Sequence, residues 1–146
     1  MKILTVKTSA RNQFLGRVAG LTLGPINAEV DVDIGDDHLI ALITRASVEH
    51  LDLQEGREVL VLVKAVSVLL LAADAKLKLS ARNQLCGAIT ECKRGAVNGE
   101  VTLRLAGGKT VVATLTNASI DRLDLKEGDS AVAAIDSSSI ILGVVL

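Results

Sequence analysis

The sequence has almost no aromatic residues. Phe14 is the single phenylalanine among 146 residues, and tryptophan and tyrosine are absent. Small β-barrels that bind single-stranded nucleic acid use aromatic stacking platforms in a basic groove, whereas the formal net charge of this chain is −1. We therefore expect no nucleic-acid partner. Because 49% of the residues are nonetheless hydrophobic, the core has to consist of valine, leucine, isoleucine and alanine.

Cysteines and long apolar runs are also scarce. The two cysteines, Cys86 and Cys92, both lie in the second half of the chain, which indicates free thiols in a reducing compartment and not a disulfide framework. The longest apolar run, residues 68–73, is too short to cross a bilayer. Residues 1–5 lack the pattern of a secretion signal. We expect a cytoplasmic protein with no membrane partner.

Residues that carry catalysis or bind metal cations do not form a recognisable set. The only histidines are His38, which we place in a turn, and His50, which we place on the exposed side of a helix; a catalytic triad or a zinc site needs further partners. The aspartates that begin at Asp31 resemble the start of a calcium loop, but the twelfth position is Leu42 where a bidentate glutamate is required. The sequence predicts neither an enzyme nor a cation site.

What the chain does contain is a duplication. Residues 9–13 read Ser-Ala-Arg-Asn-Gln and return as residues 80–84, and the matches keep an offset of 71 positions as far as Glu29 and Glu100. Such a repeat has to be interpreted before any single motif. We therefore divide the chain into two domains, residues 1–73 and residues 74–146.

The second copy is longer by one residue. Thr44 matches Thr116 at an offset of 72, and we place the added residue in the turn at Gly107 and Gly108. Each copy is near the lower size limit for burying an adequate core alone. Small aliphatic modules often complete their cores by association, so we expect an oligomer.

Both copies predict short strands and one small helix. Apolar and acidic residues alternate over residues 28–34, as in a strand with one solvated face. The period changes after Thr44, which suits an N-cap with Ser47 at the third helical position. We expect a bulge or bend in the strand over residues 9–18. The expected fold is all-β, with two tandem OB-like five-stranded barrels that have one short helix each. The expected strands are residues 1–8, 9–18, 26–34, 39–43, 59–63, 66–71, 79–89, 97–105, 111–115, 131–135 and 140–145.

The repeated polar residues are hydrogen-bond donors. Each copy offers a serine and an arginine from its opening strand, and a threonine and a serine at the start of its helix, where unpaired backbone N–H groups favour an anion. Arginine adds charge-assisted bonds, and Lys64 adds a point charge. This chemistry suits a small oxyanion; simple capping by Thr44 and an Arg11 that lies along the surface are the structural alternatives. The candidate residues are Ser9, Arg11, Thr44 and Ser47, with Ser80, Arg82, Thr116 and Ser119.

The same segments resemble the molbindin or Mop domain, which also forms the effector part of a molybdate-responsive transcription regulator. The resemblance covers both copies, so the chain as a whole resembles the two-domain molbindin. The chain has no room for a DNA-binding helix-turn-helix, so we expect it not to be the intact regulator. The segments that carry the resemblance are residues 8–13, residues 27–30, the pair Thr44 and Ser47, and residues 63–65, with their counterparts in the second copy.

The resemblance implies a function and an assembly. The expected function is intracellular binding, storage and buffering of molybdate, with tungstate as an analogue, in Mop- or TOBE-type modules that form a trimer around a threefold axis. Two other classes of function stay open: an accessory protein that signals molybdate status to a transporter or regulator, and an assembly module that has lost its ligand. Intact donors in the first copy argue against the last.

The resemblance also implies sites that are shared between modules. Ser9, Arg11 and Lys64 come from one side, and Thr44 and Ser47, or their equivalents Thr116 and Ser119, come from a neighbour. Ala65, which follows Lys64, is a further expected site residue. The second copy departs from this pattern, because Asp136 stands at the position of Lys64, and Ser137, at the position of Ala65, offers only partial compensation. An Asp136 that is turned away or paired with Arg82 is the alternative to repulsion, which for unit charges at about 4 Å is roughly 4 kcal/mol at intermediate dielectric.

Overall fold

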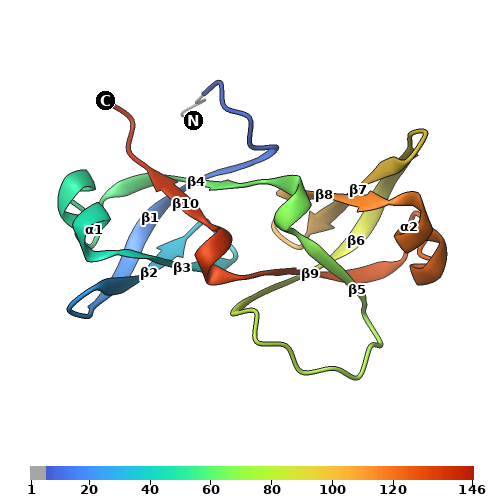
Figure 1. Ribbon diagram of the computed structural model, residues 1–146, viewed down its shortest axis with the longest axis horizontal. Helices are drawn as coiled ribbons and strands as arrows, with labels where there is room; N and C mark the ends of the chain where they lie inside the picture. The colour runs from blue at the N-terminus through green and yellow to red at the C-terminus, as the bar shows by residue number, and fades with distance from the viewer. Residues whose placement is uncertain (1–5) are drawn as a thin grey trace.

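The protein forms two small β-barrels that lie side by side. The computed structural model describes residues 6–146, and Figure 1 shows one lobe around each helix, with the chain crossing between the lobes at the centre. This confirms the all-β fold with one short α-helix in each half. The elements are β1 (Asn12–Leu23), β2 (Asn27–Asp33), β3 (His38–Thr44), α1 (Arg45–Leu51), β4 (Glu58–Val63), η1 (Ala65–Ser67), β5 (Leu69–Ala72), β6 (Asn83–Arg94), β7 (Asn98–Leu105), β8 (Thr110–Thr116), α2 (Asn117–Leu123), β9 (Ser130–Ile135), η2 (Ser137–Ser139) and β10 (Ile141–Gly143).

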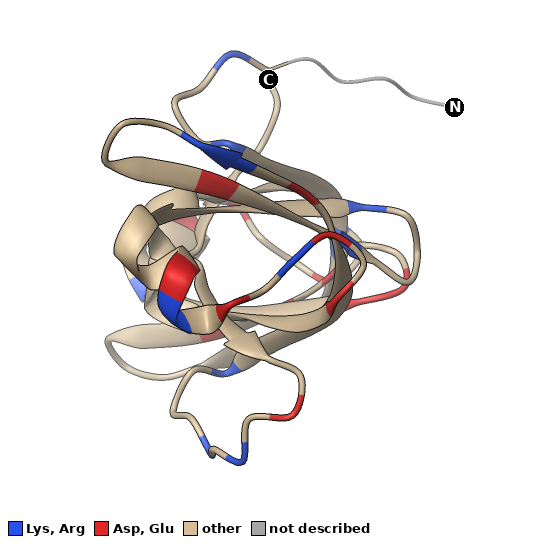
Figure 2. Cartoon of the chain, turned by 90° about the vertical axis from the view of Figure 1, so that its right-hand side faces the viewer, with Lys and Arg blue, Asp and Glu red and all other residues tan. Residues whose placement is uncertain are grey.

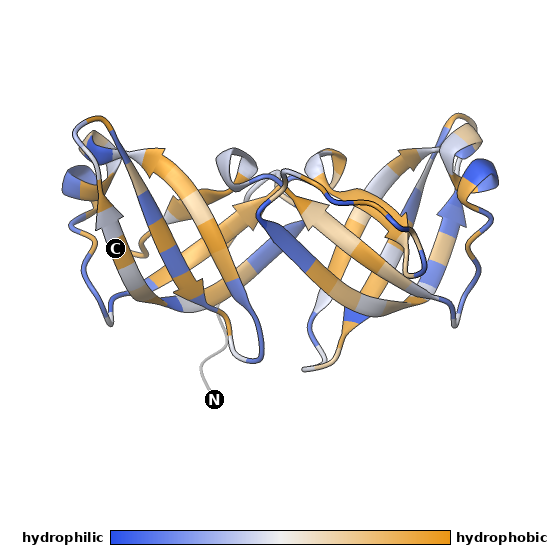
Figure 3. Cartoon of the chain, turned by 90° about the horizontal axis from the view of Figure 1, so that it is seen from below, coloured by the Kyte–Doolittle hydropathy of each residue, from blue (hydrophilic) through white to orange (hydrophobic). Residues whose placement is uncertain are grey.

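Each five-stranded sheet takes its last strand from the other repeat. The first sheet has the order β10-β4-β1-β2-β3 and the second the order β5-β9-β6-β7-β8. The strand β10 pairs antiparallel with β4, and β5 pairs antiparallel with β9, so the two lobes in Figure 3 are joined by two crossing segments. Neither barrel is made of one repeat alone. The predicted boundary after residue 73 therefore stays a prediction about the sequence repeat.

Alternation along the strands places the aliphatic core. In β2, Ala28, Val30 and Val32 are buried while the acidic residues between them are half-buried, as the period of two predicted. Phe14 is 5% exposed and packs among valine, leucine and isoleucine side chains. Among residues 6–146 no charged side chain is buried. Seen from the side of the second barrel, the strands form a ring, and the charged residues lie mainly on its turns, its helix and scattered strand positions (Figure 2).

Two glycines of the repeat are required by close packing. The ladder between β1 and β2 shifts register between Val18 and Gly20, which confirms the expected bulge. A Cβ atom at Gly16 would lie 2.6 Å from the carbonyl oxygen of Asp33, and one at Gly87 would lie 2.5 Å from that of Arg104. Because real Cβ atoms do not approach backbone oxygens this closely, only glycine fits between the opening strand and its neighbour at these two positions.

The extra residue of the second copy lies where the offset placed it. In the first copy four residues separate the paired Asp33 and His38, whereas five separate Arg104 and Thr110 in the second. Gly108 takes a positive φ of 92° in that longer turn, a conformation in which glycine has no Cβ penalty.

Several strand predictions were wrong at the ends. The segment predicted as a strand over residues 66–71 begins inside the 3-10 turn η1, and β5 starts only at Leu69. The segment predicted over residues 140–145 follows the 3-10 turn η2 and is a strand only over Ile141–Gly143. The chain has to change direction there to cross into the other barrel, and the Ser67 N–H donates to the Lys64 carbonyl to form that corner. The opening strand begins at Asn12 and not at residue 9. Of the lead-in strand expected over residues 1–8, residues 1–5 lie outside the described part, and residues 6–8 are irregular.

The asparagine of the repeated motif ties the barrels together. Asn12 and Asn83 are 2% and 3% exposed. The side-chain amide of Asn83 donates to the carbonyl of Ile40 at 2.9 Å and accepts from its N–H at 2.7 Å; Asn12 makes the same two bonds with Val112 at 2.9 and 2.8 Å. Since β3 and β8 are edge strands, each amide takes the place of a neighbouring strand at one residue.

Removal of one amide is expected to destabilise the whole chain. In Asn83→Ala the N–H and carbonyl of Ile40 lose their partner in a part-buried place, so the free energy of unfolding should fall by about 1–3 kcal/mol. Urea unfolding followed by circular dichroism measures this change. The matched control is Gln84→Ala, because Gln84 is exposed and its amide donates only to the local Ala81 carbonyl. Equal midpoints for the two variants would refute the role of the amide.

Candidate oxyanion-binding site

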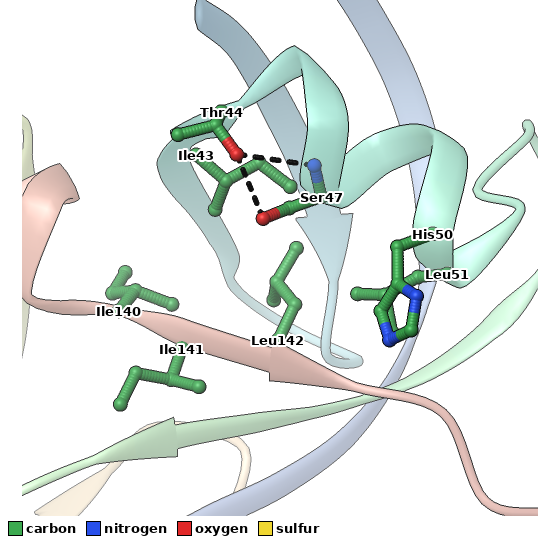
Figure 4. Close-up of a pocket in the computed structure, with 8 residues that line it drawn as sticks. All are labelled: Ile43, Thr44, Ser47, His50, Leu51, Ile140, Ile141 and Leu142. Carbon is green, nitrogen blue, oxygen red and sulfur yellow. Dashed lines mark hydrogen bonds between the residues drawn. The ribbon is translucent and has the colours of Figure 1, made fainter.

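The predicted hydroxyl pairs are formed at both helix starts. Thr44 is the N-cap of α1, and its Oγ1 accepts from the N–H of Ser47 at 3.0 Å. The two hydroxyl oxygens lie 2.8 Å apart (Figure 4). Thr116 and Ser119 repeat this arrangement at α2, with 3.1 Å for the cap and 2.9 Å between the hydroxyls. Capping is therefore real, and it still leaves one of the two hydroxyl hydrogens of each pair to donate outward.

The hydroxyl pair of α1 borders a mostly apolar pocket. The pocket has a volume of about 350 Å³ and lies between the helix and β10, where the barrel is not closed by a ladder between β3 and β10 (Figure 4). Its walls are mostly apolar and supply few donors besides the hydroxyls. A charged partner for an anion therefore has to come from another part of the molecule. The lining residues are Ile43, Thr44, Ser47, His50, Leu51, Ile140, Ile141 and Leu142.

The predicted cationic residues share one corner of the first barrel. Asn12 pairs with Val63 at one end of the antiparallel ladder between β1 and β4. Arg11, which precedes Asn12, and Lys64, which follows Val63, therefore both lie just beyond this end of the ladder. Lys64 is exposed and precedes η1, whose Ala65 is 6% exposed. Ser9 is exposed in the segment that leads into this corner. The sequence prediction that these residues act together is consistent with this placement.

The equivalent corner of the second barrel carries an acid. Asn83 pairs with Ile135, which places Arg82 and Asp136 together as Arg11 and Lys64 are in the first barrel. Ser137 is 8% exposed in η2, and Ser80 is exposed. The carboxylate of Asp136 accepts from the Ser138 hydroxyl at 3.1 Å.

Both motif arginines form ion pairs with glutamates of the other repeat. Arg11 donates from Nη1 to Glu100, and Arg82 donates from Nη1 to Glu29 at 2.9 Å. The alternative in which Arg82 pairs with Asp136 is therefore wrong. The hydrogen bond from Arg11 lowers the pKa of Glu100 below its usual value, and the same bond raises the pKa of Arg11.

The hydroxyl half and the cationic half of the predicted site have separate partners within the chain. The side-chain bonds of Thr44 and Ser47 stay within the start of α1, whereas those of the arginines go to glutamates. The corner η1 packs against β8, and η2 packs against β3, so each corner lies beside the strand that leads to the other repeat's hydroxyl pair. Whether a neighbouring chain completes these sites stays a prediction.

The sequence did not predict that Glu29 and Glu100 bind the motif arginines, or that residues of β10 line the pocket beside α1. Glu29 and Glu100 recur at the constant offset of 71, but the sequence predicts only a solvated strand face for Glu29 and no role for Glu100. Their partners sit in the other repeat, and no sequence spacing shows that contact. The lining residues of β10 were missed because the strand exchange that brings them to α1 is invisible in the repeat pattern.

The histidines behave as surface residues, with one correction. His38 does not sit in a turn but begins β3, where its Nδ1 lies 2.7 Å from Asp31 and this hydrogen bond raises the pKa of His38. Among residues 6–146, no group of three or more histidine, cysteine, aspartate or glutamate side chains is arranged to hold a metal ion. In the same part of the chain, no helix has the length and apolar character needed to span a membrane.

Comparisons with known proteins place both repeats in one family. The TOBE domain model matches residues 8–70 and again residues 79–142. The chain is 45% identical over 145 residues to the molybdenum transport protein ModE of Azotobacter vinelandii, a match that covers 99% of this chain and 53% of the relative. It is 39% identical over 142 residues to the molybdenum-pterin-binding protein MopB of Rhodobacter capsulatus, covering 97% of this chain and 53% of the relative. The chain thus spans about half the length of these curated relatives.

A solved structure matches the whole fold. It is the cytoplasmic molybdate-binding protein ModG with molybdate bound, 46% identical, with a TM-score of 0.91 and coverage of 95% of this chain and 99% of that chain. The chain belongs to the TOBE-domain family and carries two copies of the domain in tandem, which confirms the family resemblance recognised from the repeated motifs.

Proposed function

We propose that this protein binds molybdate, and tungstate as an analogue, and acts as a cytoplasmic store and buffer without catalysing a reaction. The observation that carries the proposal is the match of both barrels to molybdate-bound ModG over 99% of that chain. The cytoplasm is the proposed location because ModG is described as cytoplasmic. Relatives named for molybdenum transport and molybdenum-pterin binding support the same ligand element.

The chemistry of molybdate fits the available donors. At neutral pH molybdate is a doubly charged tetrahedron that has no proton to donate, so its site needs hydrogen-bond donors and cations. Two hydroxyl pairs, two arginines and Lys64 supply both kinds of group. We propose as site residues Ser9, Arg11, Thr44, Ser47, Lys64, Ala65, Ser80, Arg82, Thr116, Ser119 and Ser137.

We propose that the sites are completed in a homo-oligomer, with a trimer as the expected form. The separate partners of the hydroxyl and cationic halves support this arrangement, because a neighbouring module then brings the halves together. Exposed apolar side chains on the edge strands of the two sheets also support association. Leu42 on β3 is 37% exposed, Leu69 on β5 is 53% exposed and Ile141 on β10 is 57% exposed. Burial of such side chains favours association.

A sensing role is the second candidate. The ModE relative from A. vinelandii has about as much chain again beyond the matched part, so the same two barrels also occur within a longer protein. In that case molybdate would alter a surface that a transporter or regulator contacts. Hydrogen exchange with and without molybdate separates the roles, because a store needs protection only around the ligand and a sensor needs a change at a distant surface.

Loss of Lys64 should weaken molybdate binding strongly. Unit charges at about 4 Å attract by roughly 4 kcal/mol at intermediate dielectric, and solvent screening of this exposed side chain reduces that value. We expect Lys64→Ala to lower the affinity of the sites that use it about tenfold or more, equivalent to about 1.4 kcal/mol. Titration calorimetry with sodium molybdate measures it. The control is Lys126→Ala in the turn before β9, and equal affinities in both variants would remove Lys64 from the site.

Replacement of Asp136 should create or tighten sites in the second repeat. A carboxylate beside a dianion repels it, and a lysine at the same corner reproduces the first repeat. Native mass spectrometry in excess sulfate should show more retained molybdate per assembly for Asp136→Lys than for the unchanged protein. Asp136→Ala, which removes repulsion without adding a cation, should lie between them. Identical counts for all three proteins would mean that Asp136 stays outside the ligand's surroundings.

A further inference from the structure

Each motif arginine is held by a glutamate from the other repeat, and this reciprocity was not foreseen from the sequence. Arg11 of the first repeat bonds Glu100 on β7, and Arg82 of the second bonds Glu29 on β2. Two residues at equivalent positions thus make equivalent bonds in opposite directions between the barrels. Both copies of the duplicated sequence therefore keep the arginine and its glutamate partner.

The ion pair uses only part of each guanidinium. In the part of the chain that the structure describes, both arginines donate to the glutamate through Nη1. A guanidinium has five N–H donors in a rigid plane, so a bond through one nitrogen leaves the Nη2 and Nε edge to a second anion. The arginine side chains are 54% and 51% exposed, which leaves that edge accessible to a ligand.

Both glutamates lie within strands that are paired on both sides. Glu29 lies inside β2, opposite Thr22 on one side and Leu42 on the other. Glu100 lies inside β7, between Lys93 and Thr114. A carboxylate in the middle of a paired strand has little backbone freedom, so it fixes the guanidinium that it binds.

The residue after each arginine is fixed as well. Asn12 and Asn83 are buried and bond the backbone of the opposite edge strand twice. Each arginine is therefore anchored at its backbone by the asparagine and at its head by the glutamate. An arginine without such anchors loses rotamer freedom when a ligand orders it, and preorganisation removes part of that loss.

We propose that Glu29 and Glu100 are positioning residues of the oxyanion sites: each holds the other repeat's motif arginine by one nitrogen, so that the remaining donors are ready for molybdate. This proposal rests on the proposed function. The negative charge of the glutamate itself opposes a dianion, so positioning and repulsion act in opposite directions. They can be separated, because glutamine keeps the accepting oxygen and removes the charge.

The test compares two substitutions at the same residue. Calorimetric titration of the full chain with sodium molybdate at fixed ionic strength should show about tenfold weaker binding for Glu100→Ala, the usual scale for one charge-assisted hydrogen bond. Glu100→Gln should bind as tightly as the unchanged protein or more tightly. Glu29→Ala and Glu29→Gln should behave in the same order at the sites that use Arg82. Glu127→Ala, in the exposed turn after α2, is the control.

A double substitution shows whether the glutamate acts through the arginine. Arg11→Ala should weaken binding, and Glu100→Ala added to it should have no further effect. Tighter binding in Glu100→Ala would mean that the glutamate competes with molybdate for Arg11, and failure of glutamine to rescue would mean that its role is structural; either result overturns the positioning role and leaves the proposed function intact. An unchanged protein that takes up no molybdate would overturn both.

Discussion

The structure depends on two side-chain amides that substitute for missing strands. A barrel of five short strands leaves edges at β3 and β8, and unpaired edge groups are unfavourable when buried. Asn12 and Asn83 each satisfy one residue of the opposite edge with a pair of bonds. Because the next residue toward the N-terminus is the motif arginine, the bond that joins the barrels also places the cation. One short motif therefore serves the fold and the candidate site together.

The sequence predicted the fold class well because the strongest signals were local. Alternation in β2, the cap and third-position serine of each helix and the offset of the repeat all depend on residues that are close along the chain. Strand ends were less accurate at the first crossing, where residues 65–67 form a 3-10 turn. An apolar run looks the same whether it continues straight or turns a corner into another barrel, so periodicity gave no warning.

The sequence predicted which residue types lie at the candidate site, but it did not predict which residues the arginines contact. The hydroxyl pairs Thr44 with Ser47 and Thr116 with Ser119 were found because a helix start has a local pattern, and the structure shows both. Glu29 and Glu100 were not included, because their partners lie in the other repeat. A contact between distant segments leaves no trace in one sequence. The same reason explains why Asp136 was considered for Arg82, its neighbour in the barrel, when the arginine in fact bonds across the junction.

The exchange of β5 and β10 has a consequence for how such a molecule can arise. A chain with a single repeat would have a four-stranded sheet and a fifth strand directed away from it, so it would have to borrow that strand from a second molecule. Its folding would then depend on protein concentration. When two repeats lie in one polypeptide, the exchange of strands is intramolecular. A short linker then keeps each repeat at a high effective concentration relative to the other. With both repeats in one polypeptide, the two barrels complete each other during folding and need no encounter with a second molecule.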